Sequence, residues 1–135
     1  MNKFGCLEGY DVSITVSGIT YELDSVQTVD VETFQNLHRI SIQDSLIDID
    51  LVNVIYSGKF FDKEVGIEAR GVMRGVDGLD YDSTLRVRNA KLIVFNLPNT
   101  DDAISNPMLE FEVGIINEYG GSNVTLSVED EAREV

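Results

Sequence analysis

The chain has 135 residues, of which 43% are hydrophobic and 25% charged, and its 24 acidic against 10 basic side chains give a formal net charge of -14. These values fit one globular domain with a core of its own, and they exclude collagen-like, low-complexity and disulfide-framework chains. Because an acidic surplus of this size repels phosphate backbones and anionic membrane surfaces, we expect no direct binding to nucleic acid or membranes.

Cysteine content and the first residues indicate the cellular compartment. The single Cys6 cannot form an internal disulfide, and residues 1–5 lead into Glu8 and Asp11 without the apolar stretch of a secretory signal. No apolar run approaches the roughly 18 residues that cross a bilayer. We therefore expect a cytoplasmic protein with one domain over residues 1–135, in which residues 129–135 form a frayed acidic tail.

Apolar residues recur at every second position along most of the chain, which is the pattern of strands with one buried and one exposed face. Gly18 lies between the first two such segments, so we expect a bulge or a turn there. A long segment at 46–56 also reads as a strand. Its predicted buried face carries Ile47, Ile49, Leu51 and Ile55, and its other face carries Asp48 and Asp50.

Glycine-rich segments separate the later strands. Ser57-Gly58-Lys59 predicts a hairpin, residues 75–78 predict a second turn, and residues 117–121 separate the last two strands. The strand at 85–97 becomes apolar on both faces in its second half, which we expect to be covered on two sides. About eight strands in total favour an all-β fold, an antiparallel β-sandwich or barrel.

Helix signals are limited to two short segments. The alternative for residues 30–37 is a short helix capped by Asp30, because Val31, Phe34 and Leu37 recur at intervals of three. Residues 100–104 read equally well as one helical turn or as a loop. The fold should therefore contain at most one or two short helices.

Catalytic and metal sites are disfavoured by the residues available. A Ser or Cys nucleophile generally needs a nearby base such as His, yet the chain has one His and one Cys. We interpret His38 as a structural histidine, because it alternates in phase with Ile40 and Ile42. Zinc ligand sets and phosphate-binding glycine motifs are missing, and the lack of Trp argues against a sugar cleft. We predict a protein that is not an enzyme and holds no metal or cofactor.

The densest acidic segment is the loop at 77–83, where Asp77, Asp80 and Asp82 surround Tyr81. A solvated hairpin loop explains this pattern most simply. Calcium is another alternative, because Ca²⁺ takes six to eight oxygen ligands, although the spacing is not that of an EF-hand. Among functional interpretations we prefer a contact with a partner, since an aromatic ring flanked by charges is frequent in interface anchors.

Two further pairs are candidates for contact with a partner. Asp48 and Asp50 form the predicted second acidic face. Phe60 and Phe61 are adjacent, and in an extended chain they point to opposite faces. Either one ring enters the core while the other covers its end, or one ring is exposed as a binding hot spot.

Charge is distributed unevenly along the chain. Residues 1–60 carry 3 basic and 9 acidic side chains, residues 61–100 carry 6 of each, and residues 101–135 carry 1 and 9. Arg86 and Arg88 share one face of their strand, and Glu110 and Glu112 share a face of theirs. If these strands are neighbours, the four residues form a cross-strand ladder of charges.

Three functional hypotheses follow. The first is a small acidic protein that neutralises a basic protein partner, in the manner of an immunity protein or an inhibitor. The alternative is a structural or assembly subunit, for instance of a phage particle, whose sheet edges pair with other copies in a homo-oligomer. The third is a β-barrel that binds a small ligand. A need for solubility, or adaptation to high salt, explains the acidic composition without any binding partner. The predicted partner contacts are Asp77, Asp80, Tyr81, Asp82, Asp48, Asp50, Phe60 and Phe61.

Overall fold

The structure, a computed structural model, describes residues 2–3, 8–23, 26–44, 49–58, 60, 63–96 and 107–133. This part of the chain contains antiparallel strands and one short helix, which confirms the all-β prediction. The strands follow the order β1-β4-β5-β8-β7-β6-β2-β3, and β9 also pairs with β7. The elements are β1 (Asn2–Lys3), β2 (Glu8–Val16), β3 (Ile19–Leu23), β4 (Val26–Phe34), β5 (Leu37–Asp44), α1 (Ile49–Tyr56), β6 (Val65–Arg74), β7 (Asp80–Asn96), β8 (Met108–Gly114) and β9 (Val124–Val128).

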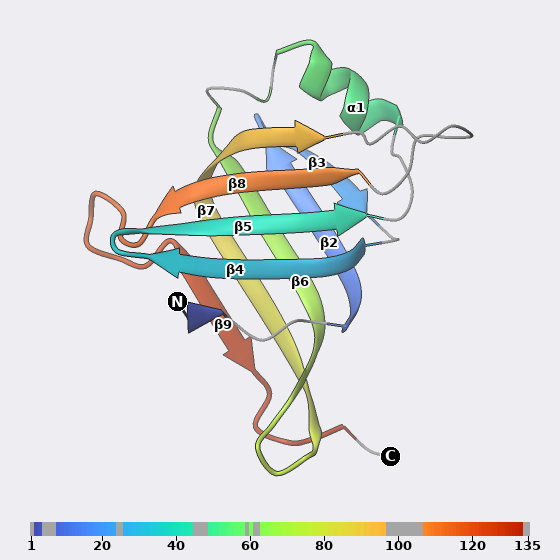
Figure 1. Cartoon of the computed structure of the whole chain (residues 1–135), viewed down its shortest axis with the longest axis vertical. Helices are drawn as coiled ribbons and strands as arrows, with labels where there is room; N and C mark the ends of the chain where they lie inside the picture. Colours follow the sequence, from blue (N-terminus) through green and yellow to red (C-terminus); the bar gives the residue numbers. More distant parts are fainter. Residues whose placement is uncertain are drawn as a thin grey trace.

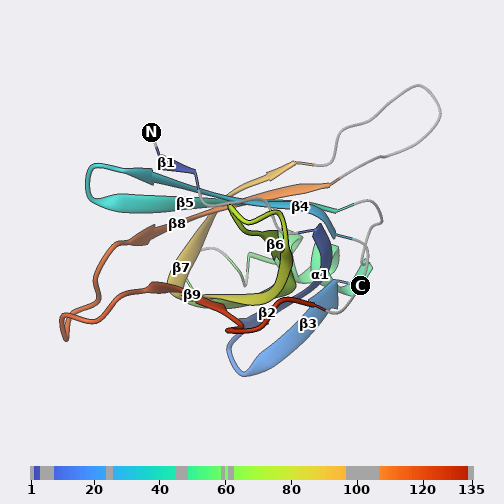
Figure 2. The same cartoon turned by 90° about the horizontal axis from the view of Figure 1, so that it is seen from below.

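Strand β7 belongs to both layers of the fold. Its first part pairs with β6 and β9, and its last part pairs with β8. One layer, the first sheet, therefore contains β1, β4, β5, β8 and the end of β7. The second sheet contains β3, β2, β6, β9 and the beginning of β7. Figures 1 and 2 show that the strands of the two layers cross and that β7 passes from one layer to the other.

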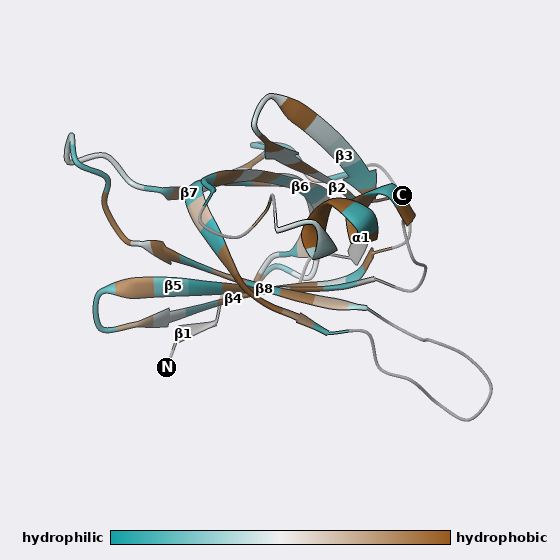
Figure 3. Cartoon of the chain, turned by 90° about the horizontal axis from the view of Figure 1, so that it is seen from above, coloured by the Kyte–Doolittle hydropathy of each residue, from teal (hydrophilic) through white to brown (hydrophobic). Residues whose placement is uncertain are grey.

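The core lies between the two sheets. Ile14 of β2, Ile40 of β5 and Phe111 of β8 are fully buried, as the alternating pattern predicts. The alternation is visible as hydrophobic and hydrophilic bands along the strands in Figure 3. His38 is also buried, its ring Nδ1 lies 2.8 Å from Thr33 Oγ1, and burial lowers its pKa. The histidine is therefore structural, as predicted.

The prediction of a strand at 46–56 is wrong, because the described part of this segment is helix α1. Leu51 and Ile55 are both buried, and their spacing of four places them on one face of a helix. Asp50 stands in the first turn, where the helix dipole favours an acid. Gly58 (φ +82°) ends the helix, and its N–H donates to the Ile55 carbonyl at 3.1 Å. In place of the predicted hairpin at 57–59, Ser57 and Gly58 form the helix C-terminus, and Lys59 lies outside the described residues.

Helix α1 lies across one end of the two sheets (Figure 1). Its inner face adds Leu51 and Ile55 to the core, while Ile49 and Tyr56 are exposed. Within the described ranges no helix is long and apolar enough to cross a membrane.

The turns between strands follow the sequence signals more closely. Ser17 (φ 51°) and Gly18 (φ 80°) form the two-residue turn between β2 and β3, which confirms the turn at Gly18. Residues 30–37 belong to the hairpin of β4 and β5, and the alternative of a short helix is wrong. The predicted turn at 75–78 joins β6 and β7. Residues 100–104 lie outside the described residues.

The predicted charge ladder between Arg86, Arg88, Glu110 and Glu112 does not form. Arg86 stands opposite Glu68 of β6, whereas Glu112 of β8 binds Arg39 of β5 at 2.9 Å. The strands β7 and β8 are neighbours, but their register pairs residues 91–96 with 108–112 and leaves Arg86 and Arg88 in the other sheet. A different row of alternating charge crosses the outer face of the first sheet in register, formed by Glu32, Arg39, Glu112 and Lys91. Because these side chains are partly exposed, each pair contributes only a few tenths of a kcal/mol.

Two expectations about segment ends are also corrected. The second half of β7 buries Leu92, but Ile93 is 37% and Val94 40% exposed, so this half is not covered on both faces. Residues 129–133 are not frayed, because the Glu129 N–H donates to Asp82 O at 2.9 Å and the Arg133 N–H donates to Asp80 O at 2.7 Å. This segment continues along β7 after β9 ends. Residues 134–135 lie outside the described part.

Candidate interaction site

The turn between β6 and β7 carries the first group of predicted contact residues. Asp77 Oδ1 accepts the N–H of Leu79 at 2.9 Å, and its Oδ2 accepts the Tyr81 hydroxyl at 2.5 Å. These bonds shape the turn, as Asp side chains often do. The hydrogen bond from Tyr81, together with the one from Leu79, lowers the pKa of Asp77, and the same carboxylate raises the pKa of Tyr81.

The other two acids of this turn have cationic partners within the chain. Asp80 lies 3.1 Å from Arg74 Nε, and Asp82 lies 3.3 Å from Arg133 Nε. In the described ranges no group of three His, Cys, Asp or Glu side chains could hold a metal ion. Because each carboxylate has a partner in its own chain, the acidic turn needs no second protein to explain it. Contact of Asp77, Asp80, Tyr81 and Asp82 with a partner stays a prediction.

The remaining candidates do not gather with this turn. Phe60 is fully buried, with its ring tilted against Tyr21 at 6.3 Å between centroids, so the prediction of Phe60 as a partner contact is wrong. Its ring fills the core instead. Asp50 is exposed on α1, and contact with a partner stays a prediction there. Asp48 and Phe61 lie outside the described residues.

The contact between Asp77 and Tyr81 predicts how the hydroxyl group of Tyr81 titrates. Substituting Asp77→Asn should lower the pKa of Tyr81 towards its ordinary value of 10.0, because the carboxylate charge and hydrogen bond that oppose phenolate formation are lost. This contact therefore stabilises the fold between the ordinary pKa values of Asp (3.8) and Tyr (10.0). The stabilisation is lost as pH falls through the lowered pKa of Asp77 and as pH rises through the raised pKa of Tyr81. The ring ¹³Cζ signal of Tyr81 in an NMR titration reports it. Asp82→Asn is the matched control, and equal pKa values in the two variants would contradict the assignment.

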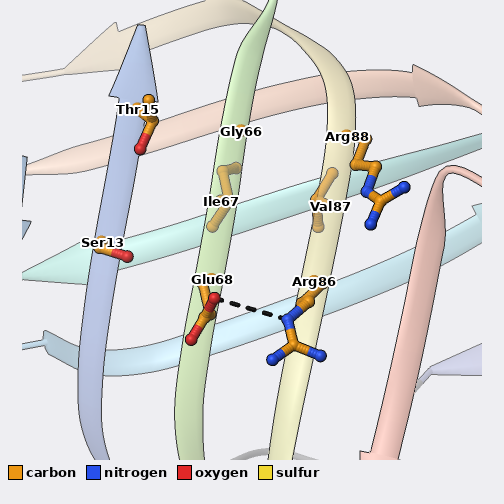
Figure 4. Close-up of a pocket in the computed structure, with 8 residues that line it drawn as sticks. All are labelled: Ser13, Thr15, Gly66, Ile67, Glu68, Arg86, Val87 and Arg88. Atoms are coloured by element: carbon orange, nitrogen blue, oxygen red, sulfur yellow. Dashed lines mark hydrogen bonds and ion pairs between the residues drawn. The ribbon is translucent and has the colours of Figure 1, made fainter. Parts of the chain in front are cut away.

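A second group of candidate residues, around Arg86 and Arg88, lies on the outer face of the second sheet. The sequence predicted only a structural role for these two arginines. Arg86 and Arg88 of β7, and Ser13 and Thr15 of β2 across Gly66, line an open cleft of about 320 Å³ (Figure 4). A Cβ added to Gly66 would meet only carbonyl oxygens, at 3.9 and 4.0 Å, which is ordinary contact. The packing of the chain therefore does not require glycine here, and its effect is to keep the cleft open.

A β-bulge sets the position of Arg88. Between the pairs Val65–Ala90 and Ile67–Val87, β7 contains one residue more than β6. The extra residue leaves Arg88 and Asn89 both exposed and returns Ala90 to the core. Asn89 has φ 61°, a left-handed conformation that Asn tolerates better than most residues.

The buried residue Asn123 holds this bulge. Its Nδ2 donates to Gly114 O at 2.9 Å, and its Oδ1 accepts from Asn89 Nδ2 at 2.9 Å. Its carbonyl accepts the Arg88 N–H at 2.8 Å. A single residue with 4% exposure thus joins the bulge of β7 to the end of β8 and the start of β9.

Residues 115–123, which we call the finger, project between β8 and β9 beyond the edge of the sheets (Figures 1 and 2). Asn117 Oδ1 accepts the N–H groups of Tyr119 at 2.8 Å and Gly121 at 3.0 Å, which fixes the tip. Ile116 is 63% and Tyr119 88% exposed. Between the finger and β7 lies a second cleft of about 400 Å³, lined by Glu64, Arg88, Asn89, Asn117, Glu118, Tyr119 and Asn123.

Arg88 lines both clefts and differs from the other arginines. In the described part of the chain Arg88 has no ion pair, whereas the other arginines each have one, namely Arg39, Arg70, Arg74, Arg86 and Arg133. The partner of Arg86 is shared, because Glu68 lies 3.5 Å from Arg86 but 2.9 Å from Arg70. A free guanidinium in a chain with this acidic surplus is suited to a carboxylate from outside the chain, which its planar fork can bind with two hydrogen bonds.

Comparison with known proteins adds little to this geometry. No family model and no curated protein matches the chain. A solved structure described as a crystal structure of Hcp protein is similar at 13% sequence identity, over 96% of this chain and 100% of that chain, with a TM-score of 0.46. A similarity at this level does not establish a common family. Any proposal about function therefore rests on the residues of this chain.

Proposed function

We propose that the chain is a non-enzymatic assembly subunit that associates with copies of itself through the outer edge of β9. Strand β9 pairs with β7 on one side, and no strand of the described ranges pairs with its other side. Its sequence, Val-Thr-Leu-Ser-Val, has no charge, proline or glycine. Monomeric proteins usually protect exposed sheet edges with such residues. This unprotected edge is the observation that carries the proposal.

The backbone of β9 has hydrogen-bonding groups directed away from β7. The Glu129 N–H donates to Asp82, and Asn123 accepts from Arg88, so the odd-numbered residues face β7. Antiparallel strands alternate in this respect, and the N–H groups of Leu126 and Val128 therefore point outward. A second strand can pair with them. Val128 is 45% exposed, so its side chain adds apolar contact area at this edge.

The test is self-association measured by sedimentation equilibrium over a range of concentrations. Val128→Pro should weaken association about tenfold or more, because it removes an outward N–H from each copy, and each bond contributes about 1 kcal/mol. The position does not donate to β7, so the fold should persist, which circular dichroism checks. Val128→Thr keeps the N–H and should associate like the wild type. A wild type that is monomeric throughout, or equal association of both variants, would show that the proposal is wrong.

Neutralisation of a basic protein remains a second candidate, supported by the net charge of -14 and by the exposed acids Glu129, Asp130 and Glu131. Salt separates the two candidates. Two copies with this charge repel each other, so added salt should strengthen self-association, whereas it should weaken a complex with a basic partner. The same sedimentation experiment at about 50 mM and about 500 mM salt shows whether salt strengthens or weakens the association.

A further inference from the structure

The free guanidinium of Arg88 lies beside the proposed assembly edge. In the pairing of β7 with β9, Arg86 stands opposite Thr125, and Arg88 bonds through its backbone to Asn123. Both facing residues are short, so β9 leaves the two guanidinium groups open to a strand arriving at its outer edge. Figure 4 shows that the side chain of Arg88 points away from Glu68.

The direction of strand pairing decides which segment of a second copy arrives there. If β9 pairs antiparallel with β9 of the copy, the residues that follow Val128 of the copy run back past Thr125 and Asn123. Those residues are the acids Glu129, Asp130 and Glu131, all exposed in the single chain.

The outward N–H groups also determine which face these acids take. They belong to even-numbered residues, so even residues pair with even and odd with odd, and directly opposite residues share one face of a sheet. Glu129 of the copy therefore lies on the face of Thr125, which is the face of Arg86. Two strand spacings, about 10 Å, separate it from β7, a gap that a long Arg and a Glu side chain can bridge together.

We propose that Arg88, together with Arg86, binds carboxylates of the acidic segment 129–131 of a second copy. The inference rests on the self-association proposed above and names the residues that complete it. The segment cannot reach Arg88 of its own chain, because the N–H groups of Glu129 and Arg133 hold it along the other end of β7, at Asp82 and Asp80. In a two-fold dimer the contact occurs twice, and it offsets part of the repulsion between two copies that each carry a net charge of -14.

Other sources of an anion fit less well. Glu64 and Glu118 line the cleft next to Arg88, yet in the described residues neither forms an ion pair with it. The phosphates of a nucleic acid would meet the repulsion of the whole chain.

The test uses charge reversal with controls of equal charge. Arg88→Glu should weaken self-association by about tenfold more than Arg70→Glu, which changes the same charge on the same sheet. In the Arg88→Glu background, the pair Glu129→Lys and Glu131→Lys should restore association to near the wild-type level. The pair Asp11→Lys and Glu22→Lys, with the same change in net charge at exposed positions of β2 and β3, should not.

The outcomes separate this inference from the proposed function. If Val128→Pro weakens association but Arg88→Glu behaves like Arg70→Glu, the edge pairs as proposed and the role of Arg88 is wrong. If both lysine pairs restore association equally, net charge governs it and the contact is also wrong. A wild type that never associates removes both proposals together.

Discussion

Replacing Phe60 by alanine is expected to lower the free energy of unfolding by about 3–5 kcal/mol. The ring is fully buried and packs against Tyr21 at the point where the chain leaves α1 and enters the core. Truncation leaves a cavity that the neighbouring strands and helix cannot close completely. Domains of this size are stable by only about 5–15 kcal/mol, so urea unfolding should show a large shift of the midpoint.

Phe34→Ala is the matched control for this measurement. The Phe34 ring is 38% exposed, and Arg39 lies over it at 5.6 Å from the ring centroid. Its loss should cost about 1 kcal/mol or less, since exposed contacts of this kind are weak. If the two variants unfolded at the same urea concentration, Phe60 would not be the core residue that the structure shows.

The segment at 46–56 shows why alternation alone misled the sequence analysis. Leu51 and Ile55 fit a strand face when they are counted in steps of two, and they fit a helix face equally well as a step of four. Short apolar runs are ambiguous in this way. Asp50 near the start and Gly58 after the end were the signals that could have decided for the helix.

The Arg88 site could be predicted only in part. Both arginines of β7 are evident in the sequence, but their partners depend on which strands are neighbours, a non-local property. One local signal of the bulge was present, because Val87 and Ala90 are apolar at a spacing of three and so break the alternation. Nothing local indicates that Asn123, which is 34 residues further along, binds the side chain of Asn89.

The strong charge of the chain and its open β9 edge oppose each other. An uncharged strand at the end of a sheet pairs readily with other chains, and a net charge of -14 keeps copies apart at low salt. Pairing then requires either screening by salt or a local contact of opposite charge. Arg86 and Arg88 lie in residues 61–100, the part of the chain that carries equal numbers of acids and bases. These two arginines stand opposite Thr125 and Asn123, beside the open edge of β9, and can supply such a contact.

Substituting Asn123→Ala is expected to lower the free energy of unfolding by about 2–3 kcal/mol, because it leaves the buried partners of the Asn123 amide without their hydrogen bonds. The loss also removes the support of Asn89 in its left-handed conformation. We therefore expect faster hydrogen exchange at the Arg88 amide and, since the bulge positions that side chain, weaker self-association.

Asn117→Ala is the control that separates the effect of losing Asn123 from the effect of loosening the finger in general. It removes the bonds to the N–H groups of Tyr119 and Gly121, which are exposed, so global stability should change by about 1 kcal/mol or less while exchange rises only at the tip. Equal stability of the Asn123 and Asn117 variants would contradict the role given to Asn123. If Asn123→Ala lowered stability but left exchange at Arg88 and self-association unchanged, the network would be structural only, and the bulge would not depend on it.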